Sequence, residues 1–231
     1  MDFSQNERLM AEDYPPLGPL PGVTFARYKK RRRIERYLKN SIDRTGAGVL
    51  IILLSPLFLL VSLLVALEDG WPVIYRRRVV GTSGEFDAFK FRSMKQGADA
   101  ILDADPILRG EFEQNFKLKN DPRLTRLGCF LRRSSLDELP QLFNVLKGQM
   151  SLVGPRMKTL AEVERYGSYK NLLRTVKPGI TGYWQVHGRQ DTSYDDRIRM
   201  DMYYIQNWSL AMDLRILIKT PLKVLRKEGA Y

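Results

Sequence analysis

The sequence predicts an α+β fold that is mainly helical, with a helical membrane segment near its start and one small β-hairpin. Three observations support this prediction. Residues 46–67 contain no charged side chain, and residues 72–92 have the pattern of two short strands around a turn at Gly81–Gly84. Most of the remaining chain has the apolar spacing of helices, at residues 98–118, 139–146, 162–176 and 194–227.

Composition divides the chain into three parts. Residues 1–26 mix prolines and glycines without apolar periodicity, which predicts a disordered, Pro-rich N-terminus. Residues 27–70 hold a basic amphipathic segment followed by the membrane helix. In residues 71–231, several helices carry aromatic and aliphatic residues beside Lys and Arg. That pattern is typical of amphipathic helices in a membrane interface, and also of ordinary core helices.

The charge balance favours anionic partners. Lys and Arg number 38 against 26 acidic residues, a formal net charge of +12. Anionic membrane lipid and phosphorylated substrates fit this excess, whereas no nucleic acid is expected because DNA-binding motifs are absent. Cys129 and His187 are the only cysteine and histidine, which excludes an internal disulfide and a Cys/His zinc site. A bound metal would need oxygen ligands, which suits Mg²⁺.

The uncharged segment 46–67 would form a helix about 33 Å long, near the thickness of a bilayer's hydrocarbon core. Ser55-Pro56 breaks it, because the proline lacks the amide that would bond to the carbonyl of Ile52. Basic residues flank both ends, from Arg27 to Lys39 and at Arg76–Arg78. A spanning helix would send one basic flank across the membrane, whereas a re-entrant helix-break-helix keeps both on the cytoplasmic face. From these residues alone, both arrangements remain open.

The strongest chemical signal is the segment RRSSLDELPQ at residues 132–141, where two adjacent carboxylates follow two arginines. Asp137 and Glu138 would lie at a helix N-terminus, where main-chain amides and the helix dipole favour anions. Such carboxylates can share a Mg²⁺ ion with phosphate oxygens, and an aspartate can attack phosphorus. Arg132 could then neutralise phosphoryl oxygens.

A structural alternative explains the same residues. Ser135 and Glu138 have the spacing of a capping box, in which Glu138 would only close the start of the helix. A helix start nearer Leu139, with Pro140 as the first helical residue, is equally allowed.

Three further basic residues could add phosphate contacts. Lys90 and Arg92 would share one face of a strand, and Arg156 follows a tight turn at Gly154-Pro155. Each of these residues, taken alone, is more often a surface charge.

Together, these motifs resemble the monotopic phosphoglycosyl transferases, the bacterial sugar transferases that begin exopolysaccharide, O-antigen and glycoconjugate assembly. The resemblance covers about residues 35–231. The matching positions, in chain order, are Asp43, Ser55-Pro56, Lys90–Met94, Asp121–Arg123, Ser135–Gln141, Gly148–Arg156, Pro178–Gly182 and Asn207–Ser209.

The resemblance implies a function and a location. A sugar-1-phosphate would pass from a UDP-sugar to polyprenyl (undecaprenyl) phosphate, with release of UMP and a covalent aspartyl-phosphosugar intermediate. Asp137 matches the nucleophile, Glu138 its partner at the Mg²⁺ site, and Arg132 a phosphate-binding arginine. Ser55-Pro56 matches the break of a re-entrant helix, which places residues 71–231 as a catalytic domain on the cytoplasmic face of the bacterial plasma membrane. The apolar surface of that helix could also pair with a second copy in a homodimer.

Two positions depart from the family pattern. Met157 stands where the family usually has a proline after Pro155-Arg156, which affects the loop at the reaction centre. Asn40 stands where an arginine often precedes the membrane segment.

Two other hypotheses remain. Asp103 and Asp105 resemble the Asp-x-Asp metal pair of nucleotide-sugar glycosyltransferases, which would release UDP, although a solvated helix end explains them equally well. A non-catalytic basic membrane-surface protein would tolerate the loss of Asp137 and Glu138.

Overall fold

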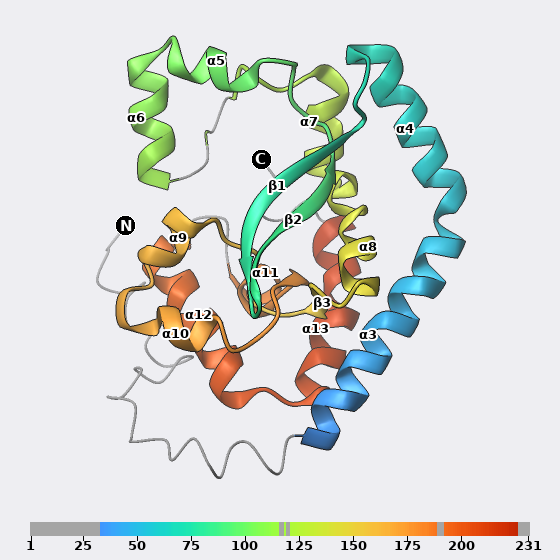
Figure 1. Cartoon of the computed structure of the whole chain (residues 1–231), viewed down its shortest axis with the longest axis vertical. Helices are drawn as coiled ribbons and strands as arrows, with labels where there is room; N and C mark the ends of the chain where they lie inside the picture. Colours follow the sequence, from blue (N-terminus) through green and yellow to red (C-terminus); the bar gives the residue numbers. More distant parts are fainter. Residues whose placement is uncertain (1–32, 116–117, 119–120, 189–191, 226–231) are drawn as a thin grey trace. The chain divides into compact units, whose positions relative to one another are not determined.

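The computed structural model describes residues 33–115, 118, 121–188 and 192–225. By internal contacts the chain divides into two units, Met1–Leu38 and Lys39–Tyr231. The predicted disordered residues 1–26 lie outside the described residues, as does the start of the basic segment up to residue 32. The described part is mainly helical with two small sheets, which confirms the predicted fold class at that level (Figure 1).

The apolar segment forms two helices, α3 (Arg33–Leu53) and α4 (Ser55–Asp69), bent by 65° at the break between them. Pro56 supplies no amide to Ile52, and the Ser55 hydroxyl donates to that carbonyl at 2.8 Å instead. The predicted break is therefore confirmed. Within the described ranges, no helix is by itself both long and apolar enough to cross a membrane, although α3 and α4 together are.

Strands β1 (Ile74–Gly81) and β2 (Gly84–Phe91) form the predicted antiparallel hairpin. Tyr75 pairs with Lys90, and Arg77 pairs with Ala88. Cross-strand partners share a face and neighbours alternate, so Arg77 and Lys90 project from the same side. This face is the one that looks onto the candidate site.

Three helices follow the hairpin: α5 (Ala98–Asp103), α6 (Pro106–Asn115) and α7 (Arg126–Arg133). The helical segment expected over residues 98–118 is thus interrupted before Pro106. The sequence did not reveal α7, whose start is capped by Thr125, since its Oγ1 accepts from the Gly128 amide at 2.8 Å.

Helix α4 packs on the hairpin and on α7, as Figure 1 shows. Val61 and Val65 of α4 form a buried cluster with Phe91 of β2 and Leu131 of α7. The ring of Phe58 lies 5.7 Å from that of Phe91. These contacts place the end of α7, and with it the segment that follows, beside the hairpin.

A 3-10 turn (Leu136–Glu138) leads into α8 (Gln141–Leu146) and then β3 (Ser151–Val153). Strand β3 pairs in parallel with β4 (Gly179–Thr181), in a region predicted to be a glycine-rich loop. The two segments approach so closely that a Cβ on Gly179 would lie 2.1 Å from the Gly154 nitrogen. Only glycine fits at this position.

The remaining helices are short until the last two. They are α9 (Leu160–Glu164), a 3-10 turn (Gly167–Tyr169), α10 (Lys170–Leu173), α11 (Tyr183–His187), α12 (Tyr194–Asn207) and α13 (Leu210–Leu225). The single helix predicted over residues 162–176 is wrong, because Gly167 takes a left-handed conformation (φ 52°) and ends the run. The helical segment expected over residues 194–227 is divided into α12 and α13 at Trp208-Ser209.

Candidate active site

Asp137 and Glu138 lie in the 3-10 turn between α7 and α8. The capping-box alternative is wrong, since Ser135 has a left-handed backbone (φ 55°) and its side chain caps nothing. The helix also begins later than either alternative allowed, at Gln141 with Pro140 as its N-cap residue. Both carboxylates are therefore free of a capping role and face the hairpin and the loop after β3.

The Glu138 carboxylate is held by two cations. Lys90 of β2 donates to Oε1 at 2.7 Å, and Arg156 donates to Oε1 at 2.6 Å and to Oε2 at 3.4 Å. Burial opposes ionisation, but the charges of Arg156 and Lys90 outweigh it and lower the pKa of Glu138 to about 2. Glu138 is thus a fixed anion that orients two basic side chains.

Asp137 has a different environment, although it is the next residue. It is 5% exposed, and its Oδ2 lies 3.7 Å from the Lys90 nitrogen, beyond hydrogen-bonding distance. Among the described residues, none donates a hydrogen bond to this carboxylate. Burial raises the pKa of Asp137, with the charge of Lys90 as the largest opposing influence.

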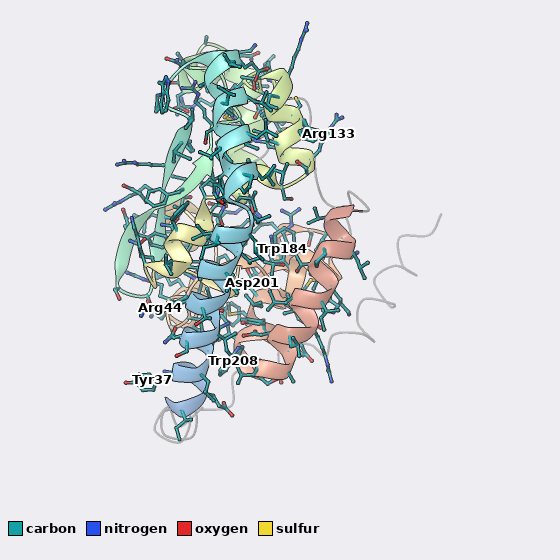
Figure 2. The ribbon with its side chains drawn as sticks, turned by 90° about the vertical axis from the view of Figure 1, so that its right-hand side faces the viewer. Tyr37, Arg44, Arg133, Trp184, Asp201 and Trp208 are labelled. Atoms are coloured by element: carbon teal, nitrogen blue, oxygen red, sulfur yellow. The ribbon has the colours of Figure 1, made fainter. Side chains whose placement is uncertain are left out.

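Arg132, on the last turn of α7, uses only its Nε–H in a hydrogen bond to a described residue. Its Nε donates to Ser93 Oγ at 3.0 Å, and its Nη1 lies 3.8 Å from Asp121, which already binds Arg123 through two bonds of 2.8 Å. Neither Nη atom of Arg132 donates a hydrogen bond within the described part of the chain, and burial lowers its pKa. This guanidinium is suited to binding an anion. The neighbouring Arg133 is exposed and points outward (Figure 2).

Main-chain contacts hold Arg156 toward Glu138. The Gly154 amide donates to Thr181 at 2.9 Å, and the Gly179 amide donates to Pro155 at 2.8 Å. Met157, at the position where the resemblance leads one to expect proline, is buried, and Arg156 still reaches Glu138.

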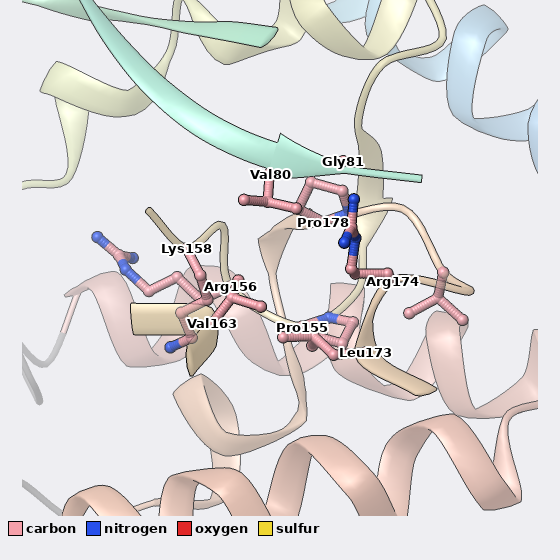
Figure 3. A pocket seen from close by; sticks show the side chains of 10 residues that line it. Val80, Gly81, Pro155, Arg156, Lys158, Val163, Leu173, Arg174 and Pro178 are labelled. Atoms are coloured by element: carbon pink, nitrogen blue, oxygen red, sulfur yellow. The ribbon is translucent and has the colours of Figure 1, made fainter. Parts of the chain in front are cut away.

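A cavity of about 20 Å³ adjoins the loop of Arg156 and is also lined by Lys158, Arg174 and Pro178 (Figure 3). This volume suits a single water molecule rather than a sugar nucleotide. Asp137 and Glu138 do not line this cavity.

The structure does not bring Arg92 to the carboxylates. Its Nη2 donates to the carbonyls of Asp69 and Gly70, each at 2.6 Å, and lies 3.2 Å from the Asp69 carboxylate. Arg92 thus binds the C-terminal end of α4, where a cation complements the free carbonyls and the helix dipole.

Asp103 is the last residue of α5 and Asp105 directly precedes α6, and both form local contacts there. Asp103 pairs with Arg109, and Asp105 accepts from the amides of Ile107 and Leu108 at 3.0 Å each. Both residues are exposed. Nowhere in the described ranges do three His, Cys, Asp or Glu side chains gather as a metal site. A metal at Asp137 and Glu138 would need further ligands from substrate phosphate and water, which is how Mg²⁺ is usually held.

One basic residue near the site was missed by the sequence analysis. Arg77 of β1 projects from the same hairpin face as Lys90, and its Nη2 donates to Glu162 at 3.0 Å. Burial is the largest cause that lowers the pKa of Arg132, and the charge of Arg77 also contributes. The alternation of Arg76, Arg77 and Arg78 along a strand was the signal that could have identified it.

Comparison with known proteins identifies the family of this chain. Residues 34–227 match the model of the family described as bacterial sugar transferase. The chain is 46% identical over 200 residues to the UDP-galactose-lipid carrier transferase of Erwinia amylovora, covering 85% of this chain and 42% of that protein. It is 48% identical over 205 residues to the undecaprenyl-phosphate galactose phosphotransferase of Salmonella typhimurium, covering 87% and 43% respectively.

A third relative is similar in length. The exopolysaccharide production protein ExoY of Rhizobium meliloti is 43% identical over 205 residues, which cover 87% of this chain and 91% of that protein. The chain thus spans about two fifths of the first two relatives and most of the third. On the extent of these matches, the chain belongs to the bacterial sugar transferase family.

Proposed function

We propose that this protein is a phosphoglycosyl transferase. It moves a sugar-1-phosphate from a UDP-sugar to undecaprenyl phosphate and releases UMP, as the first membrane step of polysaccharide or glycoconjugate synthesis. The names of the Erwinia and Salmonella relatives support a UDP-sugar donor and an undecaprenyl phosphate acceptor, and that of ExoY supports a role in exopolysaccharide production.

The observation that carries the proposal is the contrast between the two neighbouring carboxylates. Glu138 is held by Lys90 and Arg156 mainly through Oε1, and its low pKa makes it a poor nucleophile. Asp137 is buried, accepts no hydrogen bond from the described residues, and has a raised pKa. A carboxylate with little solvation is the more reactive of the two, so Asp137 is the nucleophile and Glu138 the residue that positions its surroundings.

The reaction proceeds in two displacements at one phosphorus. An Asp137 oxygen attacks the β-phosphorus of the UDP-sugar, the bond from that phosphorus to the bridging oxygen breaks, and UMP leaves with the electron pair. An oxygen of undecaprenyl phosphate then attacks the phosphorus of the aspartyl-phosphosugar and displaces the Asp137 carboxylate. Arg132 neutralises the phosphoryl oxygens, and the buried site strengthens that interaction.

Magnesium fits the donor set of this site. Asp137 has no hydrogen-bond donor among the described residues, and Glu138 Oε2 has only the 3.4 Å contact from Arg156. Both side chains offer the hard oxygen ligands that Mg²⁺ prefers, together with phosphate and water. The bound ion would neutralise charge on the transferring phosphate.

The bent pair α3 and α4 supplies the membrane attachment in this proposal. Its exposed apolar residues would contact lipid as a re-entrant helix: Val49, Leu50, Ile52, Leu53, Leu59, Leu60, Leu63, Leu64 and Leu67. The exposed stripe Leu214, Ile218 and Leu222 on α13 would rest in the interface of the same leaflet. The basic flanks favour the cytoplasmic face.

Nucleotide release tests the reaction. Purified protein in lipid or detergent is given Mg²⁺, undecaprenyl phosphate and a panel of UDP-sugars, with Asp137→Asn alongside. We expect UMP from the wild type with one or more sugars and none from the variant. Release of UDP would instead favour a glycosyltransferase that uses Asp103 and Asp105, and full turnover by Asp137→Asn would exclude it as the nucleophile.

Cysteine labelling tests the re-entrant arrangement. Cys129 is replaced by serine, and single cysteines are placed at two exposed positions. Glu35 precedes the apolar segment in the sequence, and Arg76 follows it. A membrane-impermeant reagent should label both in inverted membrane vesicles and neither in intact spheroplasts. Labelling of the two positions from opposite sides would show a spanning helix.

A further inference from the structure

We propose that Arg77 binds the phosphate of the leaving nucleotide, exchanging its ion pair with Glu162 for that phosphate when substrate enters. The inference rests on the proposed phosphoglycosyl transfer and adds a residue that neither the motifs nor the relatives' names identify. It makes the Arg77–Glu162 pair a resting position rather than a permanent structural bond.

The hairpin register places Arg77 at the site. Arg77 and Lys90 project from one face of the sheet, toward the loop of Arg156 and the 3-10 turn. Arg76 and Arg78 project from the other face, where they line a separate surface depression with Asp87. The position of Arg77 is thus set by strand alternation and not by a flexible loop.

The Arg77 guanidinium is only partly committed. It donates to Glu162 through Nη2 alone, and its side chain is 29% exposed. Burial is the main cause that lowers the pKa of Arg132, and the charge of Arg77 adds to it, so the two guanidinium groups repel each other through space. A phosphate bound within reach of both cations would offset that repulsion.

Glu162 can release Arg77 without becoming an unsatisfied buried charge. Its Oε2 also accepts from the Thr159 amide at 2.8 Å and from the Thr159 hydroxyl at 2.9 Å, as part of the capping box of α9. Burial raises the pKa of Glu162, and Arg77 is the largest influence that lowers it, followed by the Thr159 amide and the charge of the buried Lys158. The anion therefore keeps partners after Arg77 moves, which keeps the free-energy cost of exchange small.

The balance of positive and negative charges at the site also supports a role for Arg77 in phosphate binding. Lys90 and Arg156 balance Asp137 and Glu138, which leaves Arg132 as the cation of that group available to substrate. A UDP-sugar brings two negatively charged phosphates. A Mg²⁺ ion, as proposed above, would neutralise the transferring phosphate, and Arg77 would supply positive charge to the leaving UMP, whose charge increases as the bond breaks.

The test compares three substitutions in an Asp137→Asn background, where no turnover interferes. Arg77→Gln removes the proposed ligand, Glu162→Gln removes only its partner, and Arg78→Gln is the matched control on the opposite face. UMP binding is measured by titration calorimetry. We expect Arg77→Gln to weaken UMP binding about tenfold or more, Arg78→Gln to leave it unchanged, and Glu162→Gln to leave it unchanged or tighten it.

The difference between Arg77→Gln, which weakens UMP binding, and Glu162→Gln, which does not, is the decisive point. If the ion pair were purely structural, both substitutions would weaken UMP binding equally and lower the melting temperature together, and the inference would be overturned.

In the otherwise wild-type enzyme, Arg77→Gln should lower kcat/KM for the UDP-sugar and leave kcat/KM for undecaprenyl phosphate unchanged. A change in the acceptor value alone would assign Arg77 to the lipid phosphate and overturn the inference. UMP binding in the inactive background does not depend on the identity of the nucleophile, so this test fails separately from the proposed reaction.

Discussion

Two clusters in this protein each hold two carboxylates beside at least one basic side chain, and they differ in how completely their hydrogen bonds are satisfied. The dyad cluster consists of Lys90, Arg132, Asp137, Glu138 and Arg156. The α13 anchor joins α3, β3, α12 and α13 and consists of Lys39, Asp43, Ser151, Tyr204, Trp208 and Asp213.

The α13 anchor is closed. Asp213 accepts from Tyr204 at 2.7 Å, from Trp208 at 3.0 Å and from Lys39 at 2.5 Å. Asp43 accepts from the Ser151 hydroxyl at 2.7 Å. A network with every acceptor used fixes the elements that contribute to it and offers nothing to a ligand.

The dyad cluster is open. Asp137 accepts no hydrogen bond from the described residues, and both Nη atoms of Arg132 are free in the same sense. The difference teaches that burial and charge alone do not identify a reactive site. Unsatisfied groups of both signs distinguish the cluster proposed to bind substrate from the one that holds the fold.

The largest expected effect separates activity from stability at the dyad cluster. Asp137→Asn should reduce turnover by roughly four orders of magnitude, because the nucleophile is lost. It should leave the melting temperature unchanged or raise it, since burial of the Asp137 charge opposes folding at neutral pH. Initial rates and thermal unfolding in detergent measure both quantities. A large drop in melting temperature would show that this cluster is structural as well.

The second prediction concerns the α13 anchor, where a substitution should lower stability and leave activity intact. Asp213→Asn cannot accept from Lys39, Tyr204 and Trp208 together, and should lower the free energy of unfolding by about 3 kcal/mol. For a chain of this size the melting temperature should fall by roughly 10 °C. Turnover per folded molecule should stay near the wild-type value.

The matched control for that substitution is Asp87→Asn. Asp87 forms an exposed ion pair with Arg78 at 3.2 Å, and such pairs contribute little. Equal losses of stability in the two variants would remove the distinction between a closed buried network and a surface pair.

The smallest effect is a shift in pH dependence. Only the ionised carboxylate attacks phosphorus, so kcat/KM for the UDP-sugar should fall on the acid side around the pKa of Asp137, above the ordinary Asp value of 3.8. Lys90 is the strongest influence that lowers this pKa, so Lys90→Gln should move the acid limb to higher pH. Lys147→Gln, an exposed lysine near the same hairpin, should not move it. An unmoved or lowered limb in Lys90→Gln would mean that Asp137 is not the group that titrates.

Local chemistry made part of this structure predictable. The break at Ser55-Pro56 followed from a missing amide, and the hairpin from a Gly-x-x-Gly turn between β-rich segments. Lys90 and Arg156 were predicted as phosphate contacts, and that role stays a prediction. The structure pairs both of them with Glu138, although they lie far apart in the sequence.

Tertiary context decided the rest. Glu138 had the spacing of a capping residue, but its carboxylate binds Lys90 of β2 and Arg156 of the loop after β3 instead. Arg92 shares a strand pattern with Lys90, yet it lies past the end of β2, where the carbonyls of α4 are the nearest acceptors. The parallel pairing of β3 and β4 joins segments about 28 residues apart, and no short-range pattern encodes it.

The most direct test of the central claim is to trap the intermediate. Wild-type protein is incubated with Mg²⁺ and a UDP-sugar but no undecaprenyl phosphate, quenched in acid and examined by intact-protein and peptide mass spectrometry. We predict a mass increase of one phosphosugar on the peptide that contains Asp137, discharge of this adduct when undecaprenyl phosphate is added, and no adduct in Asp137→Asn. UMP release that requires the acceptor and leaves no adduct, or an adduct on another residue, would contradict Asp137 as the nucleophile.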